Sequence, residues 1–134
     1  AGDYLAHGAI EAIKQSGLVP GKDVFVAGVD WNESSFQLIR NNEMEFSIGG
    51  HFVEAGIAVI LAEDYLHGIN FREFTGRIIQ TKMELMTKDN IDEIESLLDR
   101  SNWEKLDLKK LSKYHNPLLS QYEFKLREML SIEK

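Results

Sequence analysis

The chain has 134 residues, and 15 Lys and Arg against 22 Asp and Glu give it a net charge of −7. Apolar residues make up 43% of it and charged residues 28%, a balance typical of a globular domain with a buried core. The negative charge argues against nucleic acid as a partner, because non-specific binding needs Lys and Arg that neutralise phosphates. The absence of cysteine excludes disulfides, a thiolate nucleophile and cysteine-bound metal.

The longest apolar stretch, residues 55–62, is far shorter than the ~20 residues that span a bilayer. The chain begins Ala1-Gly2-Asp3 and enters a predicted helix almost at once, with no visible signal peptide and no initiator Met. We therefore expect a processed chain or an excised fragment.

The first fifty residues predict helix, strand, helix and strand in alternation. Apolar residues at helical spacing predict a helix that is capped by Asp3 and ends at Gly17. Residues 23–29 are short, rich in β-forming types and apolar on both faces, which favours a buried parallel strand. Asn32 is placed to cap a second helix, and residues 44–48 predict a second short strand.

The second half of the chain predicts mostly helix. Residues 52–67 form a long helix that is apolar on nearly every side, so neighbours must cover several of its faces. Apolar and polar residues alternate over 79–85, which predicts a third strand with one face in water. Shorter helices are predicted over residues 91–98, 106–114 and 122–130.

Helices that alternate with strands predict an α/β fold, with helices layered on a mostly parallel sheet. Three strands make a thin sheet, and the apolar strand and the apolar helix need more neighbours than this chain supplies. We therefore expect part of the surface that covers them to be missing from the chain.

Polar residues follow the first predicted strand, at the sheet edge where open α/β folds bind ligands. Asp30 could accept hydrogen bonds from two sugar hydroxyls, and the Trp31 indole could pack on the apolar face of a sugar ring. The simpler alternative is that Asp30 and Asn32 only cap the next helix. After the second strand, Gly50 and His51 are either a flexible crossing with a hydrogen-bonding His or a plain turn.

Other chemistry finds no support in the spacing of the residues. His7, His67 and His115 are scattered, with no two at the i, i+4 spacing of a helical metal pair. Residues 17–22 and 30–32 match a phosphate loop and a calcium loop only in part. We therefore expect no catalytic residue, no metal and no cofactor.

Two stretches near the N-terminus resemble a known family. GDYLAHGAIEAI at residues 2–13 and DVFVAGVD at residues 23–30, with Gly17 between them, are similar to the C-terminal third of type I periplasmic sugar-binding proteins. That family includes ribose-binding and autoinducer-2-binding proteins of ABC transport and sensing systems. The resemblance continues in order to about residue 86.

The resemblance implies a fold of two α/β lobes that are joined by three crossings and hold the ligand between them. Residues 1–48 would then be part of the second, C-terminal lobe. Residues 49–86 would be a crossover helix and a returning strand, and residues 87–134 a helical C-terminal extension.

The resemblance also implies a set of ligand-binding residues. The family's sugar-binding aspartate corresponds to Asp30, and its ligand-binding asparagine falls on Gly2. Its polar residue after the second strand falls near Gly50, with His51 beside it as a substitute. The ligand-binding set expected for this chain comprises Asp3, Asp30, Trp31, Gly50 and His51.

The implied function is non-catalytic binding of a sugar-like solute in an ABC uptake or sensory system of the periplasm. Its partners would be the ligand, a membrane permease or sensor kinase, and either a second copy of the chain or the missing N-terminal segment. One alternative is the effector-binding domain of a lac-repressor-type transcriptional regulator, which the acidic tail after Thr87 disfavours. A third possibility is an α/β enzyme, which would need a nucleophile or a phosphate loop, and the sequence shows neither.

Overall fold

The computed structural model describes residues 2–104, 106–125, 127 and 129, and the chain divides into two compact units. The first unit, called the sheet unit below, comprises Ala1–Gly50 and Met83–Ser96. The second unit, called the α3 unit, comprises His51–Lys82 and Leu97–Lys134.

The assignment of residues 1–48, 49–86 and 87–134 to the second lobe, to the crossover helix with its returning strand and to the C-terminal extension stays a prediction. The two compact units divide the chain differently. The chain leaves the sheet unit after Gly50 and re-enters it at Met83. The start of the expected C-terminal extension therefore packs with the sheet.

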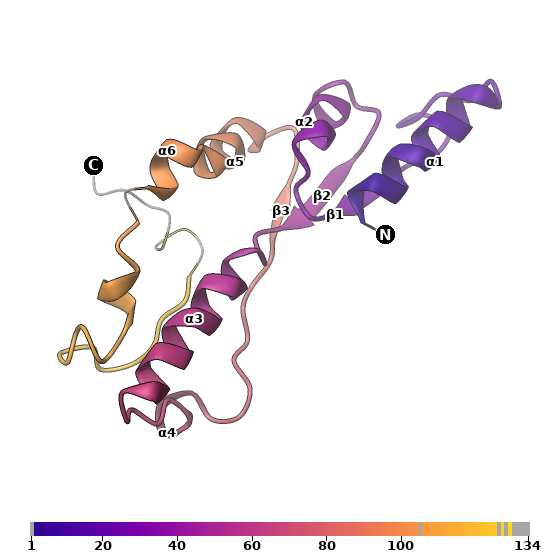
Figure 1. The fold of residues 1–134 in the computed structure, drawn as a ribbon. Coiled ribbons are helices and arrows are strands. Elements are labelled where there is room, and N and C mark those ends of the chain that lie inside the picture. Colours follow the sequence, from indigo (N-terminus) through magenta and orange to yellow (C-terminus); the bar gives the residue numbers. More distant parts are fainter. Residues whose placement is uncertain (1, 105, 126, 128, 130–134) are drawn as a thin grey trace. The chain divides into compact units, whose positions relative to one another are not determined.

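Helices and strands alternate along the sheet unit (Figure 1). This alternation around a sheet confirms the predicted α/β fold class. The elements of the unit are α1 (Asp3–Gln15), β1 (Ala27–Val29), α2 (Glu33–Arg40), β2 (Phe46–Gly49), β3 (Glu84–Met86) and the greater part of α5 (Ile91–Leu98).

The three strands form one sheet in the order β1-β2-β3. β1 and β2 are parallel, with Val29 beside Ile48. β3 is antiparallel to β2 because it begins beside the residue where β2 ends, with Glu84 next to Gly49. The carboxyl ends of β1 and β2 therefore meet at one edge of the sheet.

Both outer strands are shorter than the sequence predicts. Within residues 23–29, only Ala27–Val29 form a strand of the sheet, while Val24 makes an isolated bridge to Pro20 and the side chain of Phe25 is 71% exposed. Near the predicted strand at 79–85, only Glu84–Met86 pair. An apolar or alternating pattern makes a strand only where a neighbouring strand takes up its backbone hydrogen bonds.

The helices of the sheet unit each bury one apolar stripe, as amphipathic helices do. The core side chains with at most 1% exposure in this unit are Ile10, Ile39, Met44, Met86 and Ile94. They come from three helices, from β3 and from the turn before β2.

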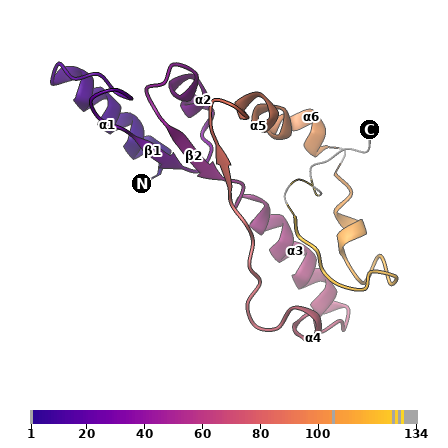
Figure 2. The ribbon, with the colours of Figure 1, turned by 180° about the vertical axis from the view of Figure 1, so that it is seen from behind.

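The α3 unit is built along one long helix. Its elements are α3 (Val53–Leu66), α4 (Arg72–Thr75), α6 (Arg100–Trp103) and the 3-10 helix η1 (Leu108–Leu111). The segment from Ser112 to Tyr122 lies beside α3 in Figure 1 and in Figure 2, and hydrogen bonds to Asp64 hold it there. In the part of the chain that the structure describes, no helix has the length and apolar character needed to cross a membrane.

α3 buries only one of its apolar faces. The buried face carries Val53, Ile57, Ile60 and Leu61. The opposite side, called the outer face of α3, is exposed and comprises Ala55, Ala58, Val59, Ala62 and Leu66. The described residues therefore cover one side of this helix and leave an apolar side open.

The C-terminal helices are the least accurate part of the prediction. The helix expected over residues 106–114 is reduced to the 3-10 helix η1. In the last expected helix, Tyr122 and Phe124 are not helical and Arg127 and Met129 are, while Leu126 and Leu130 lie outside the described residues.

Candidate functional site

The turn after β1, residues 30–32, lies at the carboxyl edge of the sheet. The backbone φ is 113° at Asp30 and 56° at Trp31, in a region that residues other than glycine rarely adopt. Such a residue costs about 1–3 kcal/mol and persists only where its surroundings hold it. The Asp30 N–H donates to the carbonyl of Ile48 at 2.8 Å, which ties the turn to β2.

The Asp30 side chain is exposed and lies over the start of α1. A Cβ atom at Gly2 would fall 3.1 Å from Asp30 Oδ2, so the missing side chain at Gly2 leaves room for the carboxylate. A helix N-terminus favours a negative charge, because its first N–H groups carry the positive end of the helix dipole. Asp30 is therefore an accessible acceptor at the edge where α/β folds bind ligands.

Asp3 is fully buried, which corrects two expectations about it. Its Oδ2 accepts a hydrogen bond from the Asn32 N–H at 2.7 Å, and its Oδ1 accepts one from Ser47 Oγ at 2.8 Å. α1 starts after Gly2 without a side-chain cap. Asp3 is thus neither the helix cap nor placed to touch a ligand, because both of its oxygens are bonded inside the sheet unit.

The Trp31 indole is only 4% exposed, so it has almost no face on which a sugar ring could stack. Its Nε1–H donates to the carbonyl of Ser47 at 3.2 Å. A Cβ atom at Gly49 would fall 2.4 Å from Trp31 Cγ, so glycine at this position lets the indole lie against β2. The structure makes Trp31 a packing residue and corrects the expectation that it stacks on a sugar.

The other expected residues divide between the two units. Gly50 is buried at the end of the sheet unit with φ of 99°, and His51 begins the α3 unit. Asn32 caps α2 as predicted, because its Oδ1 accepts from the Ser34 N–H at 3.2 Å. The ligand-binding roles of Asp30, Gly50 and His51 stay predictions.

Ser47, a polar residue in the middle of β2, was not predicted from the sequence as part of this site. Ser47 is fully buried, and its Oγ accepts from the Trp31 N–H at 3.3 Å while it donates to Asp3. A polar residue between apolar ones in a short predicted strand is a usable signal, because a buried hydroxyl needs hydrogen-bond partners.

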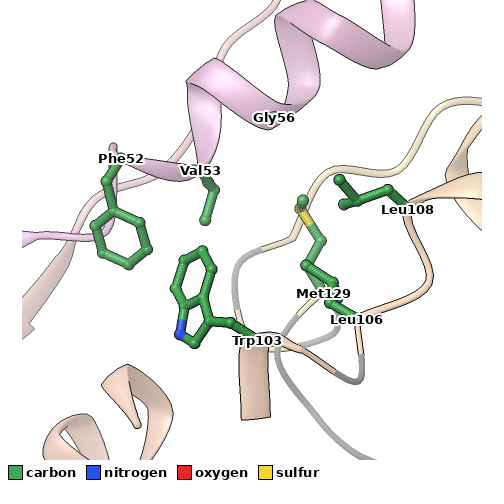
Figure 3. Close-up of a pocket in the computed structure, with 7 residues that line it drawn as sticks. All are labelled: Phe52, Val53, Gly56, Trp103, Leu106, Leu108 and Met129. Atoms are coloured by element: carbon green, nitrogen blue, oxygen red, sulfur yellow. The ribbon is translucent and has the colours of Figure 1, made fainter. Parts of the chain in front are cut away.

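The α3 unit contains an apolar cavity of about 150 Å³, shown in Figure 3. The rings of Phe52 and Trp103 lie 5.0 Å apart on one side of it. A sugar site needs polar groups that fix the hydroxyls, and this lining is apolar, so the cavity does not compete with Asp30 as a sugar site. The residues that line it are Phe52, Val53, Gly56, Trp103, Leu106, Leu108 and Met129.

The comparisons with known proteins give matches among solved structures. No protein-family model matches the chain, and no curated protein matches it. A periplasmic sugar-binding protein from Pseudomonas fluorescens matches 97% of this chain with a TM-score of 0.81 and 25% identity. The periplasmic binding protein of the arabinose ABC transporter from Shewanella sp. ANA-3, bound to α- and β-L-arabinofuranose, matches 77% with a TM-score of 0.63 and 23% identity. A periplasmic ribose ABC transporter structure from Conexibacter woesei matches 71% with a TM-score of 0.57 and 28% identity.

These structures share one fold, and the first of them covers nearly the whole chain. The chain has the fold of a portion of a periplasmic sugar-binding protein. It spans 40% of the Pseudomonas fluorescens chain, 33% of the Shewanella chain and 31% of the Conexibacter chain. The resemblance predicted from residues 2–13 and 23–30 is thereby confirmed.

Asp30 presents an exposed carboxylate at the carboxyl edge of the sheet, and a carboxylate can accept hydrogen bonds from hydroxyl donors. An ionised carboxylate only accepts hydrogen bonds, and its two oxygens can serve two donors. Among the residues that the structure describes, no three His, Cys, Asp or Glu side chains gather to hold a metal ion. The similar structures from Pseudomonas fluorescens and Shewanella are binding proteins.

Proposed function

We propose that the protein binds a sugar, without changing it chemically, through the Asp30 carboxylate at the carboxyl edge of the sheet. The observation that supports this most is an exposed carboxylate in a turn with φ values of 113° and 56°. Unfavourable backbone of this kind concentrates at binding sites, where the rest of the fold holds it. The names of the similar proteins, a sugar-binding protein and a ribose transporter, indicate the class of ligand.

Asp30 contributes hydrogen bonds to sugar hydroxyls in this proposal. Two neighbouring hydroxyls donate to its two oxygens, and such charge-assisted bonds are stronger than neutral ones. Gly50 and His51 remain further expected contacts. Asp3 and Trp31 support the turn from inside the sheet unit instead of touching the sugar.

We place this binding in the periplasm, where a membrane permease recognises the ligand-bound protein. A sensor kinase is the alternative recipient of the signal. Because the chain spans 40% of the similar Pseudomonas fluorescens protein, the ligand, the partners and the activity of a whole binding protein all belong to the proposal.

A titration with D-ribose, followed by the backbone amide NMR signals of residues 30 and 31, tests the proposal. The Asp30 site is exposed, so its charge-assisted hydrogen bonds, at about 1.5–3 kcal/mol each, do little more than offset the cost of immobilising the ligand. We expect a dissociation constant no better than about 1 mM, near −4 kcal/mol. Asp30→Ala should weaken binding by about tenfold or more.

The control for this titration is Asp23→Ala, which removes another exposed carboxylate, bonded to the Val19 N–H at 2.8 Å in a different turn. It should bind ribose like the wild type. Equal binding by Asp30→Ala and wild type would reduce Asp30 to a structural part of its turn. Micromolar binding would show that the whole site lies within these residues.

The outer face of α3 supports a second part of the proposal, that this chain associates with a second copy or with the rest of a binding protein. Val59 is 65% exposed and Leu66 82% exposed on that face, and contiguous exposed apolar surface marks an interaction site. We expect light scattering to show association that Val59→Lys with Leu66→Lys abolishes. Leu118→Lys, at a residue that is 94% exposed outside α3, is the matched control. A monomer at every concentration would contradict this expectation.

A further inference from the structure

Three consecutive backbone N–H groups in the turn after β1 donate to acceptors from two other elements. The N–H of Asp30 donates to the Ile48 carbonyl at 2.8 Å, and that of Trp31 to Ser47 Oγ at 3.3 Å. The N–H of Asn32 donates to Asp3 Oδ2 at 2.7 Å. β2 and α1 therefore fix the path of the backbone through the turn, residue by residue.

The two side-chain acceptors in this set are themselves joined. Ser47 Oγ donates to Asp3 Oδ1 at 2.8 Å, and both side chains are fully buried. A Cβ atom at Gly28 would fall 2.0 Å from Asp3 Oδ1, so glycine in β1 is what lets this carboxylate reach the sheet. A buried carboxylate that bonds two donors from two elements is a rigid anchor, because any shift of the turn leaves its charge unsatisfied.

The turn needs such an anchor because of its backbone. φ values of 113° at Asp30 and 56° at Trp31 suit glycine, which reaches them without a steric penalty. Glycine at position 30 would form this turn more easily, but it would carry no carboxylate. The chain has an aspartate at a φ that is unfavourable for its side chain. The hydrogen bonds to β2 and α1 hold the backbone in this conformation.

We propose that Asp3 and Ser47 are positioning residues, which hold the positive-φ turn and thereby aim the Asp30 carboxylate at the ligand. The inference rests on the proposed function for the ligand contact of Asp30. It adds that the geometry of this contact is set by two residues that the ligand does not touch.

A double-mutant cycle between Asp30→Gly and Asp3→Asn tests the inference by thermal unfolding of the chain. In the wild-type background, Asp30→Gly relieves the unfavourable φ and should raise the midpoint by about 4 °C. Asn at position 3 keeps the volume of the side chain but replaces one acceptor oxygen with a donor, so the turn relaxes. Asp30→Gly should then raise the midpoint by less than about half as much.

Asn42→Gly is the matched control, because Asn42 also has a positive φ, 57°, but lies at the end of α2, where its side chain bonds Lys88. Its effect should be the same with Asp3 and with Asn at position 3. If Asp3→Asn fails to fold, Ser47→Ala takes its place in the cycle, since it removes the acceptor of the Trp31 N–H. Additive effects of Asp30→Gly and the anchor variant would overturn the inference.

Ribose titration of the same variants separates positioning from folding. Asp3→Asn keeps the Asp30 carboxylate, yet it should weaken the ribose response of the residue 30 amide by about fivefold or more, at a temperature where the variant is fully folded. An unchanged ribose response in Asp3→Asn, with a lost response in Asp30→Ala, would overturn the positioning role and leave the proposed function intact. No response in Asp30→Ala and wild type alike would remove the proposed function, and the ligand part of this inference with it.

Discussion

Among the residues that the structure describes, each unit contains one fully buried aspartate, and the two have different hydrogen-bond partners. Asp3 in the sheet unit accepts two hydrogen bonds, one from a strand and one from the turn after β1. Asp64 in the α3 unit accepts four, all from the segment from Ser112 to Tyr122 that follows η1. A buried carboxylate therefore holds a single turn in the sheet unit and the longer segment from Ser112 to Tyr122 in the α3 unit.

The donors to Asp64 show how far this device reaches along the chain. They are the Ser112 hydroxyl at 2.5 Å, the Lys113 N–H at 2.8 Å, the Tyr114 N–H at 3.1 Å and the Tyr122 hydroxyl. Burial by itself raises the pKa of Asp64, but these hydrogen bonds outweigh it and hold the pKa below its ordinary value. Burial and the bond to Asp64 raise the pKa of Tyr122.

The largest effect that separates the two aspartates is the cost of removing each carboxylate. Asp64→Ala leaves four donors without their acceptor and should lower the free energy of unfolding by about 4 kcal/mol, with faster hydrogen exchange at the Lys113 and Tyr114 amides. Asp3→Ala leaves two donors without their acceptor and should lower the free energy of unfolding by about 2 kcal/mol. Denaturant unfolding of both variants measures the difference, and equal costs would break the comparison.

Glu63→Ala is the control on the same helix. Glu63 accepts from His115 at 2.9 Å near the surface, and exposed pairs of this kind contribute at most about 1 kcal/mol. A cost like that of Asp64→Ala would mean that the segment is held by its surface contacts instead of by the buried carboxylate.

Much of the sheet unit could be predicted from the sequence, because its signals are local. The cap at Asn32, the alternation of helices and strands and the position of Asp30 after β1 all follow from neighbouring residues. The burial of Asp3 does not, because it depends on the close approach of Gly28, which is remote along the chain. The burial of Trp31 likewise depends on Gly49 in the next strand.

The α3 unit was harder to predict after its long helix. The segment from Ser112 to Tyr122 has no regular hydrogen-bonding pattern, so neither a helical nor an alternating period marks it. The segment is held by side-chain hydroxyls and N–H groups that donate to Asp64. In the sequence, Asp64 is only one acidic residue in an apolar helix, and nothing marks it as an acceptor for this segment. Long-range bonds of this kind leave no local signal.

Acid should affect the α3 unit through Asp64. The pKa of Asp64 is lowered in the folded chain, so its contribution to stability is complete above its unfolded pKa, about 3.9, and is lost as the pH falls through the folded value. The difference in free energy of unfolding between wild type and Asp64→Asn should therefore be constant from neutral pH down to about pH 5 and shrink below it. Urea unfolding at several pH values measures it, and a difference that grows on acidification would contradict the direction of the shift.

The smallest expected effect on stability comes from the contacts of Lys113. Lys113 is a buried lysine next to Asp64 in the α3 unit. Lys113 Nζ donates to the carbonyls of Leu119 and Ser120 and lies 4.0 Å from the centre of the Phe74 ring. Phe74→Leu removes this cation–π contact and an edge contact with Tyr122, and should cost about 1 kcal/mol.

Phe74→Leu also removes apolar surface, so two comparisons isolate the charge. Phe25→Leu, in the exposed part of the sheet unit, reports the cost of the same exchange without a cation near the ring. If the cation–π contact contributes, Phe74→Leu should cost less in a Lys113→Met background than in the wild type, because the charge is already gone. An identical cost in both backgrounds would mean that Phe74 packs on the segment only as an apolar side chain, and that Asp64 and the two carbonyl bonds of Lys113 hold the segment without help from the ring.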